Sequence, residues 1–233
     1  DAGFDRSYYC IGYDNHFSWR HMLDGEELPL FNPDSGYYST TVFTDYALDF
    51  LHEHQEAYDS APFFLYLAYI VPHFPVQAPR EDIGKYLDIY QEGWDRIRKI
   101  RYDRMDAEGL INTTLSAREP EVKVTYEHLM PDSVLLDSLG EGEVLFPVSW
   151  ESLTPEQQEF QATKMAIHAA MVDRVDQEVG RMVDYLESID ELDNTVILFL
   201  SDNGASAEIM IRGGGHDPEA IPGSYQSYLC LGP

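Results

Sequence analysis

The chain has little cysteine and no long apolar run, and each shortage excludes a kind of protein. Its only cysteines are Cys10 and Cys230, which support neither a disulfide framework nor a cysteine-rich zinc site. No apolar stretch approaches the roughly 20 residues that a membrane-spanning helix requires. We therefore expect no membrane span in this segment.

Basic residues are also scarce. Lys and Arg together number 15 against 42 Asp and Glu, which gives a formal net charge of -27. Such a surface repels nucleic acid, so we expect no nucleic-acid partner. It repels an anionic substrate as well, so a site for such a substrate must supply its own positive charge from a metal ion, Arg or Lys.

The chain has neither an initial Met nor a signal peptide. It begins at Asp1 and stops at Pro233 just after an apolar run. This pattern predicts an internal piece of a longer protein, incomplete at both ends. A hydrophobic content of 44% is typical of a globular domain with a sizeable core.

Two short apolar runs, residues 63–69 and 196–200, have the length of buried strands. Helical patterns lie between them: one over residues 81–106, broken near Gly93, and a long one after residue 154. Strand, helix, strand in this order predicts an α/β fold with a mostly parallel sheet sandwiched by helices.

The long helix should begin at Thr154, which can form a capping box with Gln157, and end near Ile189. Its inner side is predicted to carry Val172 among other apolar residues, and its outer side the polar residues 173, 174 and 176–178. A helix from residue 41 to residue 54 and a short strand over residues 8–11 complete the prediction. Residues 107–150 show no clear period and are predicted to be a long loop.

Asp202-Asn203-Gly204 directly follows the second apolar run. A carboxylate beside a carboxamide oxygen suits Ca²⁺ and, less well, Mg²⁺, whereas zinc would call for His or Cys. The same residue types also build ordinary turns, so a turn is the alternative for the triplet alone. Because open α/β folds bind ligands at the carboxyl ends of strands, the context favours a cation site.

His73 lies between Pro72 and Pro75, just after the first apolar run. In a parallel sheet the carboxyl ends of both strands share one edge, so His73 should face the same crevice as Asp202 and Asn203. Such a set is suited to the hydrolysis of an anionic ester. A loop histidine held by packing between prolines is the alternative for His73 alone.

Five blocks occur in combination: Gly3-Phe4-Asp5; residues 63–68 with Pro72-His73-Phe74-Pro75-Val76-Gln77-Ala78-Pro79; Ala170-Met171-Val172-Asp173-Arg174-Val175-Asp176; Leu192-Asp193-Asn194-Thr195; and Ser201-Asp202-Asn203-Gly204-Ala205. With these blocks the chain resembles the arylsulfatases of the alkaline phosphatase superfamily. The resemblance covers nearly all of residues 1–233, as a single partial catalytic domain in which about residues 118–148 form an enlarged loop.

The resemblance implies a sulfuric ester hydrolase. His73 would contact the sulfate and assist departure of the alcohol, while Asp202 and Asn203 would bind Ca²⁺ and Asp202 would help to activate the nucleophile. That nucleophile would be a formylglycine, made from Cys or Ser by the formylglycine-generating enzyme. A small-molecule or carbohydrate sulfate ester would be the substrate, and the protein would be periplasmic or secreted.

The motif for formylglycine, a Cys or Ser with Pro two residues later and Arg two beyond, is absent, since Gly12 and Gly232 stand where Pro would follow Cys10 and Cys230. The family's paired aspartates and its lysine after the Asp-Asn block are also absent, so this segment alone should be inactive. Two alternatives stay open. One is a phosphodiesterase or phosphonate monoester hydrolase of the same superfamily, whose members tend to carry His at the position of Asn203. The other is a non-catalytic binding or scaffold protein on this fold.

Overall fold

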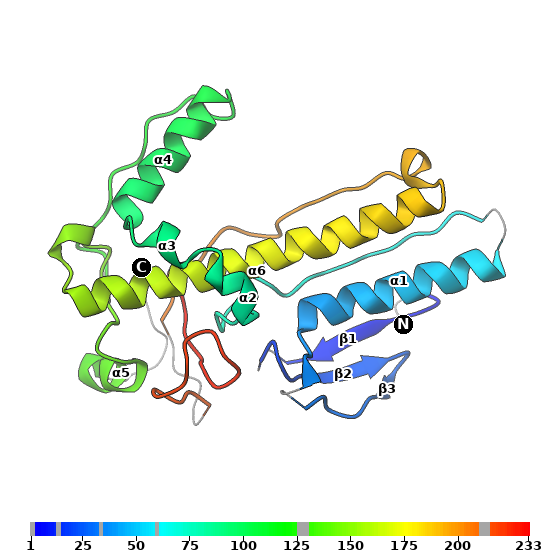
Figure 1. The fold of residues 1–233 in the computed structure, drawn as a ribbon, viewed down its shortest axis with the longest axis horizontal. Coiled ribbons are helices and arrows are strands. Elements are labelled where there is room, and N and C mark those ends of the chain that lie inside the picture. Colours follow the sequence, from blue (N-terminus) through cyan, green and yellow to red (C-terminus); the bar gives the residue numbers. More distant parts are fainter. Residues whose placement is uncertain (1–2, 13–14, 33–34, 59–60, 125–130, 210–214) are drawn as a thin grey trace.

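A computed structural model describes residues 3–12, 15–32, 35–58, 61–124, 131–209 and 215–233. Helix α6 (Pro155–Ser188) is the axis on which the other elements are arranged (Figure 1). Helix α1 (Ser39–Ala57) lies along the second half of α6, and α2 (Arg80–Gly84) and α3 (Leu87–Tyr90) contact it further toward its start.

The start of α6 confirms the predicted capping box. The Thr154 hydroxyl accepts a hydrogen bond from the Gln157 backbone N–H at 3.3 Å, and Gln157 Oε1 accepts one from the Thr154 N–H at 3.0 Å. Pro155 occupies the first turn, where its missing N–H costs nothing. The helix ends at Ser188, so its predicted end near Ile189 is confirmed as well.

The prediction of inner and outer faces of α6 is partly wrong. Val172 is 48% exposed, whereas the predicted outer residue Glu178 is 1% exposed. Thr41 Oγ1 donates to Glu178 Oε1 at 2.7 Å, and Arg181 Nη1 pairs with Glu178 Oε2 at 2.6 Å. Because α1 packs against the polar side of α6, the Glu178 carboxylate on that side is buried, and it is paired with the half-exposed Arg181.

A second charged cluster joins α2 to α6. Asp82, 1% exposed, accepts hydrogen bonds from Arg174 Nε at 2.8 Å and from Lys85 Nζ at 2.7 Å. Although burial raises the pKa of Asp82, the hydrogen bonds from Lys85, Gln177 and Arg174 outweigh it and lower the pKa below its usual value. The carboxylate is therefore held in its charged form.

The helical region over residues 81–106 is broken at Gly93, as predicted. Helix α4 (Trp94–Ala107) begins after this glycine, whose φ is 81°, and a Cβ there would lie 2.4 Å from the Trp150 ring. Only glycine combines this backbone conformation with so close a neighbour.

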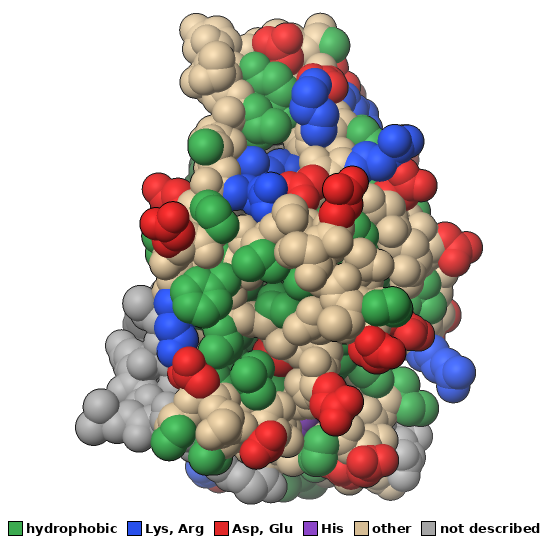
Figure 2. All heavy atoms as spheres, turned by 90° about the vertical axis from the view of Figure 1, so that its left-hand side faces the viewer, with side chains coloured by type: hydrophobic (Ala, Val, Ile, Leu, Met, Phe, Trp, Pro, Cys, Tyr) green, Lys and Arg blue, Asp and Glu red, His purple; other side chains and the backbone are tan. Residues whose placement is uncertain are grey.

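Helix α4 carries a third of the basic residues of the chain. They are Arg96, Arg98, Lys99, Arg101 and Arg104. Acidic residues are interspersed: Arg104 pairs with Glu108 at 2.8 Å, Arg96 with Glu92 and Lys99 with Asp103. On the face shown in Figure 2, Lys and Arg side chains accordingly gather near the top with Asp and Glu among them. This surface has mixed charge, so we assign no anion-binding role to it.

A small antiparallel sheet packs beside α1. Strands β1 (Tyr8–Ile11), β2 (Arg20–Leu23) and β3 (Glu26–Glu27) follow in that order, with Tyr8 opposite Leu23. The Tyr8 ring stacks on the Tyr46 ring of α1 with centroids 4.0 Å apart. The predicted strand over residues 8–11 is thus confirmed.

The two predicted core strands are extended but unpaired, and their predicted burial is wrong. We call residues 61–70 the first extended segment and residues 195–201 the second; neither joins a sheet in the part of the chain that the structure describes. The exposed fraction is 78% for Phe64 and 85% for Val196. A strand is buried by neighbours on each side, and no neighbouring strand lies among the described residues. An apolar run indicates a segment that is buried when neighbouring strands are present, but it does not show whether they are present.

The first extended segment nevertheless has the two faces of a strand. Phe63, Leu65 and Leu67 pack against a buried cluster from α1 and α6, whereas Phe64 and Tyr66 face outward. Both extended segments run alongside α6 in the opposite direction to it, and therefore in the same direction as each other (Figure 1).

Residues 107–150 contain a helix that the sequence pattern did not indicate. Helix α5 (Asp132–Leu139) contributes Leu135 and Leu139 to the core, and short 3-10 turns follow at Trp150–Ser152 and Leu192–Asn194. A helix of 8 residues is too short to be stable by propensity and depends on its tertiary contacts.

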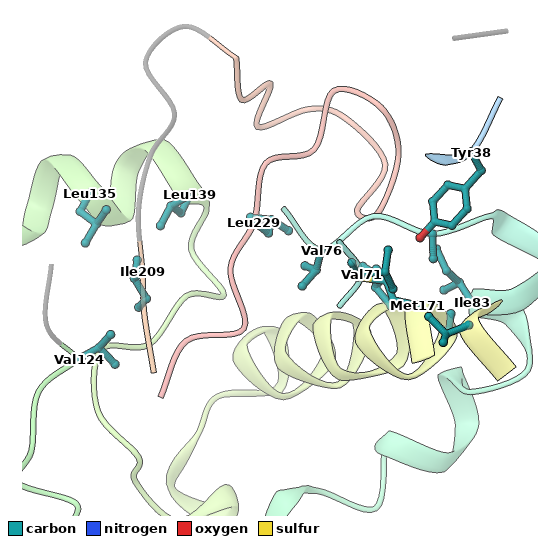
Figure 3. Packing of buried hydrophobic residues seen from close by; sticks show 14 of the residues in the cluster. Tyr38, Val71, Val76, Ile83, Val124, Leu135, Leu139, Met171, Ile209 and Leu229 are labelled. Carbon is teal, nitrogen blue, oxygen red and sulfur yellow. The ribbon is translucent and has the colours of Figure 1, made fainter. Parts of the chain in front are cut away.

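The main core lies where the chain after the first extended segment meets α6 and the C-terminal segment. Figure 3 shows Val71, Val76 and Met171 in this core, with Leu229 beside Val76. The described helices include none that is both long and apolar enough to cross a bilayer.

Candidate functional site

His73 lies in the loop that follows the first extended segment. Its backbone N–H donates to the Ile70 carbonyl at 3.0 Å, and its side chain is exposed. Nδ1 of the imidazole lies 2.7 Å from the Phe74 carbonyl oxygen, which can only accept, so Nδ1 carries a proton. A further proton then binds at Nε2. Both neighbouring prolines follow cis peptide bonds, Val71–Pro72 and Phe74–Pro75.

Residues 75–78 of this loop are buried, and hydrogen bonds link them to the C-terminal segment. The Val76 N–H donates to the Leu229 carbonyl at 2.8 Å. Gln77 is 0% exposed; its Nε2 donates to the Ser227 carbonyl at 3.0 Å, and its own carbonyl accepts from the Tyr38 hydroxyl at 2.8 Å. These contacts hold in place the backbone that follows the exposed imidazole.

Sequence reasoning did not single out His16, which contacts this loop directly. It is 0% exposed, and its Nε2 lies 3.1 Å from the His73 carbonyl oxygen. Its Nδ1 lies 3.2 Å from Ser39 Oγ. Residues 1–40 have an irregular pattern, and no motif distinguishes a buried histidine from an exposed one there.

We expect His16 to make the protein less stable in acid. Burial lowers the pKa of His16 from 6.5 to about 4. The unfolded chain therefore binds a proton at higher pH than the folded one does, and the free energy of unfolding should fall as the pH drops from 6.5 toward 4. The full loss is about 3 kcal/mol. Urea unfolding at several pH values, compared with the variant His16→Gln, measures this slope; identical slopes would contradict it.

Asp202 and Asn203 lie at the end of the second extended segment with exposed side chains. Their hydrogen bonds are local: Ser201 Oγ donates to the Asn203 carbonyl at 2.7 Å, and Asn203 Nδ2 donates to the Gly204 carbonyl at 2.8 Å. The Asn203 amide nitrogen is thereby occupied, which leaves its side-chain oxygen as a potential ligand.

The side chains of Asp202 and Asn203 are of the right chemical kind to bind a hard cation, but two ligands are too few to complete its coordination. A carboxylate and a carboxamide oxygen are suitable ligands for Ca²⁺, which takes about 6–8 oxygen atoms. Among the residues that the structure describes, no group of three or more His, Cys, Asp or Glu is placed to hold a metal ion. Asp202 and Asn203 therefore amount to part of a site.

His73 belongs to one extended segment, and Asp202 and Asn203 to the other. The segments run in the same direction, so their carboxyl ends point the same way (Figure 1). This direction agrees with the predicted shared edge, although no strand pairing holds the ends together in the described part of the chain. The shared crevice stays a prediction.

The comparisons with known proteins define the class to which this fold and these residues belong. The Sulfatase family profile matches residues 3–227. The chain is a member of the sulfatase family, which carries an α/β fold.

Three relatives illustrate the range of the family. The chain is 34% identical over 215 residues to an uncharacterized sulfatase of Schizosaccharomyces pombe, covering 84% of this chain and 33% of that protein. It is 30% identical over 196 residues to an arylsulfatase of Klebsiella aerogenes, with 84% and 36% covered. A multifunctional alkaline phosphatase superfamily protein of Trinickia caryophylli, PehA, is 28% identical over 165 residues, with 71% and 27% covered. The chain thus spans about a third of the length of these relatives.

Proposed function

We propose that residues 1–233 are part of a longer enzyme that hydrolyses sulfate esters. The observation that carries the proposal is the family match over residues 3–227 together with the exposed His73 at the carboxyl end of an extended segment. Similarity to an arylsulfatase supports a sulfuric ester, small or carbohydrate, as the substrate.

His73 has the chemistry required to assist the leaving group. With Nδ1–H donating to the Phe74 carbonyl, Nε2 is the nitrogen that gains or gives up a proton. A proton held at Nε2 can pass to the ester oxygen as the sulfur–oxygen bond breaks, which makes the departing alcohol neutral. In the sulfate-bound state the same N–H can donate to a sulfate oxygen.

Asp202 and Asn203 would hold Ca²⁺, with Mg²⁺ the less suitable ion. When bound, the metal and a formylglycine supply charge neutralisation and the nucleophile. The further ligands and the formylglycine would come from sequence outside residues 1–233, where the formylglycine-generating enzyme would act. We also propose a periplasmic or secreted location, by analogy with the family. Nucleic acid is unsuited as a partner because the net charge is -27.

The exposed apolar segments support the proposal that the chain is incomplete. Phe64 and Tyr66 in the first extended segment, and Val196, Leu198 and Leu200 in the second, are 73–85% exposed. Contiguous apolar exposure of this kind marks surfaces that are covered by another element. A mostly parallel sheet whose remaining strands lie outside residues 1–233 would cover them.

This proposal predicts a difference in hydrogen exchange. In residues 1–233 expressed alone, the amides of residues 63–69 and 196–200 should exchange within seconds, because they lack strand partners. In the protein made from its complete coding sequence they should be protected by a factor on the order of 10³ or more. Exchange mass spectrometry measures both. Equal, fast exchange in the two proteins would contradict the proposed sheet.

The test of the activity is the complete protein, co-expressed with the formylglycine-generating enzyme. We expect hydrolysis of 4-nitrophenyl sulfate to exceed that of 4-nitrophenyl phosphate, and residues 1–233 alone to hydrolyse neither. A complete sequence without a Cys or Ser in the formylglycine context would contradict the sulfatase proposal and favour a binding or scaffold protein on this fold.

A phosphodiesterase or phosphonate monoester hydrolase is the second candidate, favoured by the similarity to the multifunctional superfamily protein PehA. Asn203 weighs against it, since we expect His at this position in such enzymes. Preference for the phosphate or a phosphonate monoester in the same assay would select this alternative.

A further inference from the structure

We infer that buried His16 is a positioning residue for His73, holding the backbone carbonyl of His73 so that its exposed imidazole keeps a fixed direction. The inference rests on the proposed role of His73 in sulfate ester hydrolysis. His16 itself is too deeply buried to touch a substrate, since it is 0% exposed.

Every polar group of His16 has a partner in the surrounding structure. Its backbone N–H donates to Gln77 Oε1 at 2.9 Å, and its carbonyl accepts from the Ser39 N–H at 2.8 Å. Because the His73 carbonyl can only accept, Nε2 of His16 carries the proton and Nδ1 accepts from the Ser39 hydroxyl. The ring is thus fixed in one tautomer and one orientation.

The same network holds the loop at two positions, one at His73 itself and one four residues further along the chain. His16 holds the loop at residue 73 through Nε2 and at Gln77 through its backbone N–H. Gln77 in turn donates to the carbonyls of Tyr225 at 3.2 Å and Ser227 at 3.0 Å. The imidazole of His73 thus projects from a loop that the His16 ring holds at the His73 carbonyl and the His16 backbone holds at the Gln77 side chain.

The direction of this imidazole matters because proton transfer requires hydrogen-bond reach. The carbonyl held by His16 belongs to the peptide that joins His73 to Phe74, and Phe74 supplies the carbonyl to which Nδ1–H donates. Rotation of that peptide would displace both the backbone of His73 and the acceptor of its ring. A displacement of about 1 Å can reduce a rate on the order of 10²-fold.

The chain offers a matched control in His21. It is also 0% exposed, its Nε2 donates to the Pro29 carbonyl at 2.9 Å, and its Nδ1 lies 2.9 Å from the Tyr8 hydroxyl. His21 lies in β2, and both of these ring partners lie outside the loop of His73. Replacement of either histidine removes a buried donor to a carbonyl, but only His16 holds the loop.

The first experiment needs no enzymatic activity. In the complete protein, His16→Leu removes the donor, His16→Gln keeps an N–H near the position of Nε2, and His21→Leu is the control. We expect His16→Leu to accelerate hydrogen exchange over residues 73–78 at least about tenfold and to move the His73 C2–H resonance. His16→Gln should restore both readouts in large part, and His21→Leu should change neither. Unaltered exchange and an unaltered resonance in folded His16→Leu would overturn the inference.

The second experiment measures how strongly hydrolysis depends on protonation of the leaving group. Phenyl sulfate has a poorer leaving group than 4-nitrophenyl sulfate and depends more on a proton donor. For His16→Leu we expect kcat to fall on the order of 10²-fold with phenyl sulfate and only several-fold with 4-nitrophenyl sulfate, with KM little changed. His21→Leu should lower both rates by one common factor, as a merely structural change does.

The outcomes separate the two proposals. Equal losses for both esters in His16→Leu would overturn the positioning role while leaving sulfatase activity intact. Absence of sulfate hydrolysis in the unaltered protein would contradict the proposed function instead. The exchange and resonance comparison would then decide by itself whether His16 holds the His73 loop.

Discussion

Replacing Asp202 by alanine in the complete protein should reduce sulfate ester hydrolysis on the order of 10³-fold. The proposed Ca²⁺ site would lose a charged oxygen ligand and the proposed nucleophile its activating carboxylate. Because Asp202 is exposed and its neighbours bond only locally, the thermal unfolding temperature of the metal-free protein should hardly change. Steady-state kinetics and calorimetric titration with Ca²⁺ measure the two losses.

The control for this substitution is Asp184→Ala. Asp184 is an exposed carboxylate on α6, 18 positions before Asp202 and outside both extended segments. Its removal also lowers the negative charge by one, so it accounts for any general electrostatic effect on an anionic substrate. Equal activity in Asp202→Ala and Asp184→Ala would remove Asp202 from the mechanism.

The largest effect on stability should come from Lys164→Met. Lys164 Nζ lies 2.6 Å from Glu143 Oε1, and the two side chains are 0% and 1% exposed. Among the residues that the structure describes, Glu143 Oε2 has no hydrogen-bond partner. Without Lys164 the buried carboxylate keeps only neutral donors, Gln161 Nε2 and the Val144 N–H, and the loss of its cationic partner costs about 3–5 kcal/mol. Denaturant unfolding of the complete protein measures the loss.

A double substitution tests the reason for that loss. Lys164→Met combined with Glu143→Leu removes both charges, and it should recover most of the stability because the desolvation of both ions is also removed. Arg104→Met, which breaks the exposed pair with Glu108 at 2.8 Å, should leave stability nearly unchanged. Additive losses in the double variant would show that packing, and not charge, dominates at Lys164.

The helices were predictable because their signals are local. The capping residues Thr154 and Gln157 lie three positions apart, and Gly93 has the positive φ that ends one helix before the next. Helix α5 was not predicted, because it is stabilised by the contacts of Leu135 and Leu139 with the core and not by a local sequence signal. Glu178 was predicted to face solvent, because the spacing of apolar residues in α6 does not show that α1 packs against its polar side.

In the candidate site, too, some residues were predictable from local sequence and one was not. His73, Asp202 and Asn203 were found because each directly follows an apolar run, which is a pattern in the sequence itself. His16 was not, because its contact with the His73 carbonyl joins positions 57 residues apart. No local pattern encodes such a contact.

By itself, the sequence determined the family of this protein, the order and direction of its main elements, and which side chains follow the two extended segments. These properties depend on short-range spacing and on residue chemistry. The tertiary structure alone decided that the two apolar segments pair with no strand among the described residues, that Glu143 and Lys164 form a buried pair, and that His16 holds the loop of His73. Those properties depend on which distant segments come into contact, because burial and hydrogen bonding are relations between elements and not attributes of one stretch of chain.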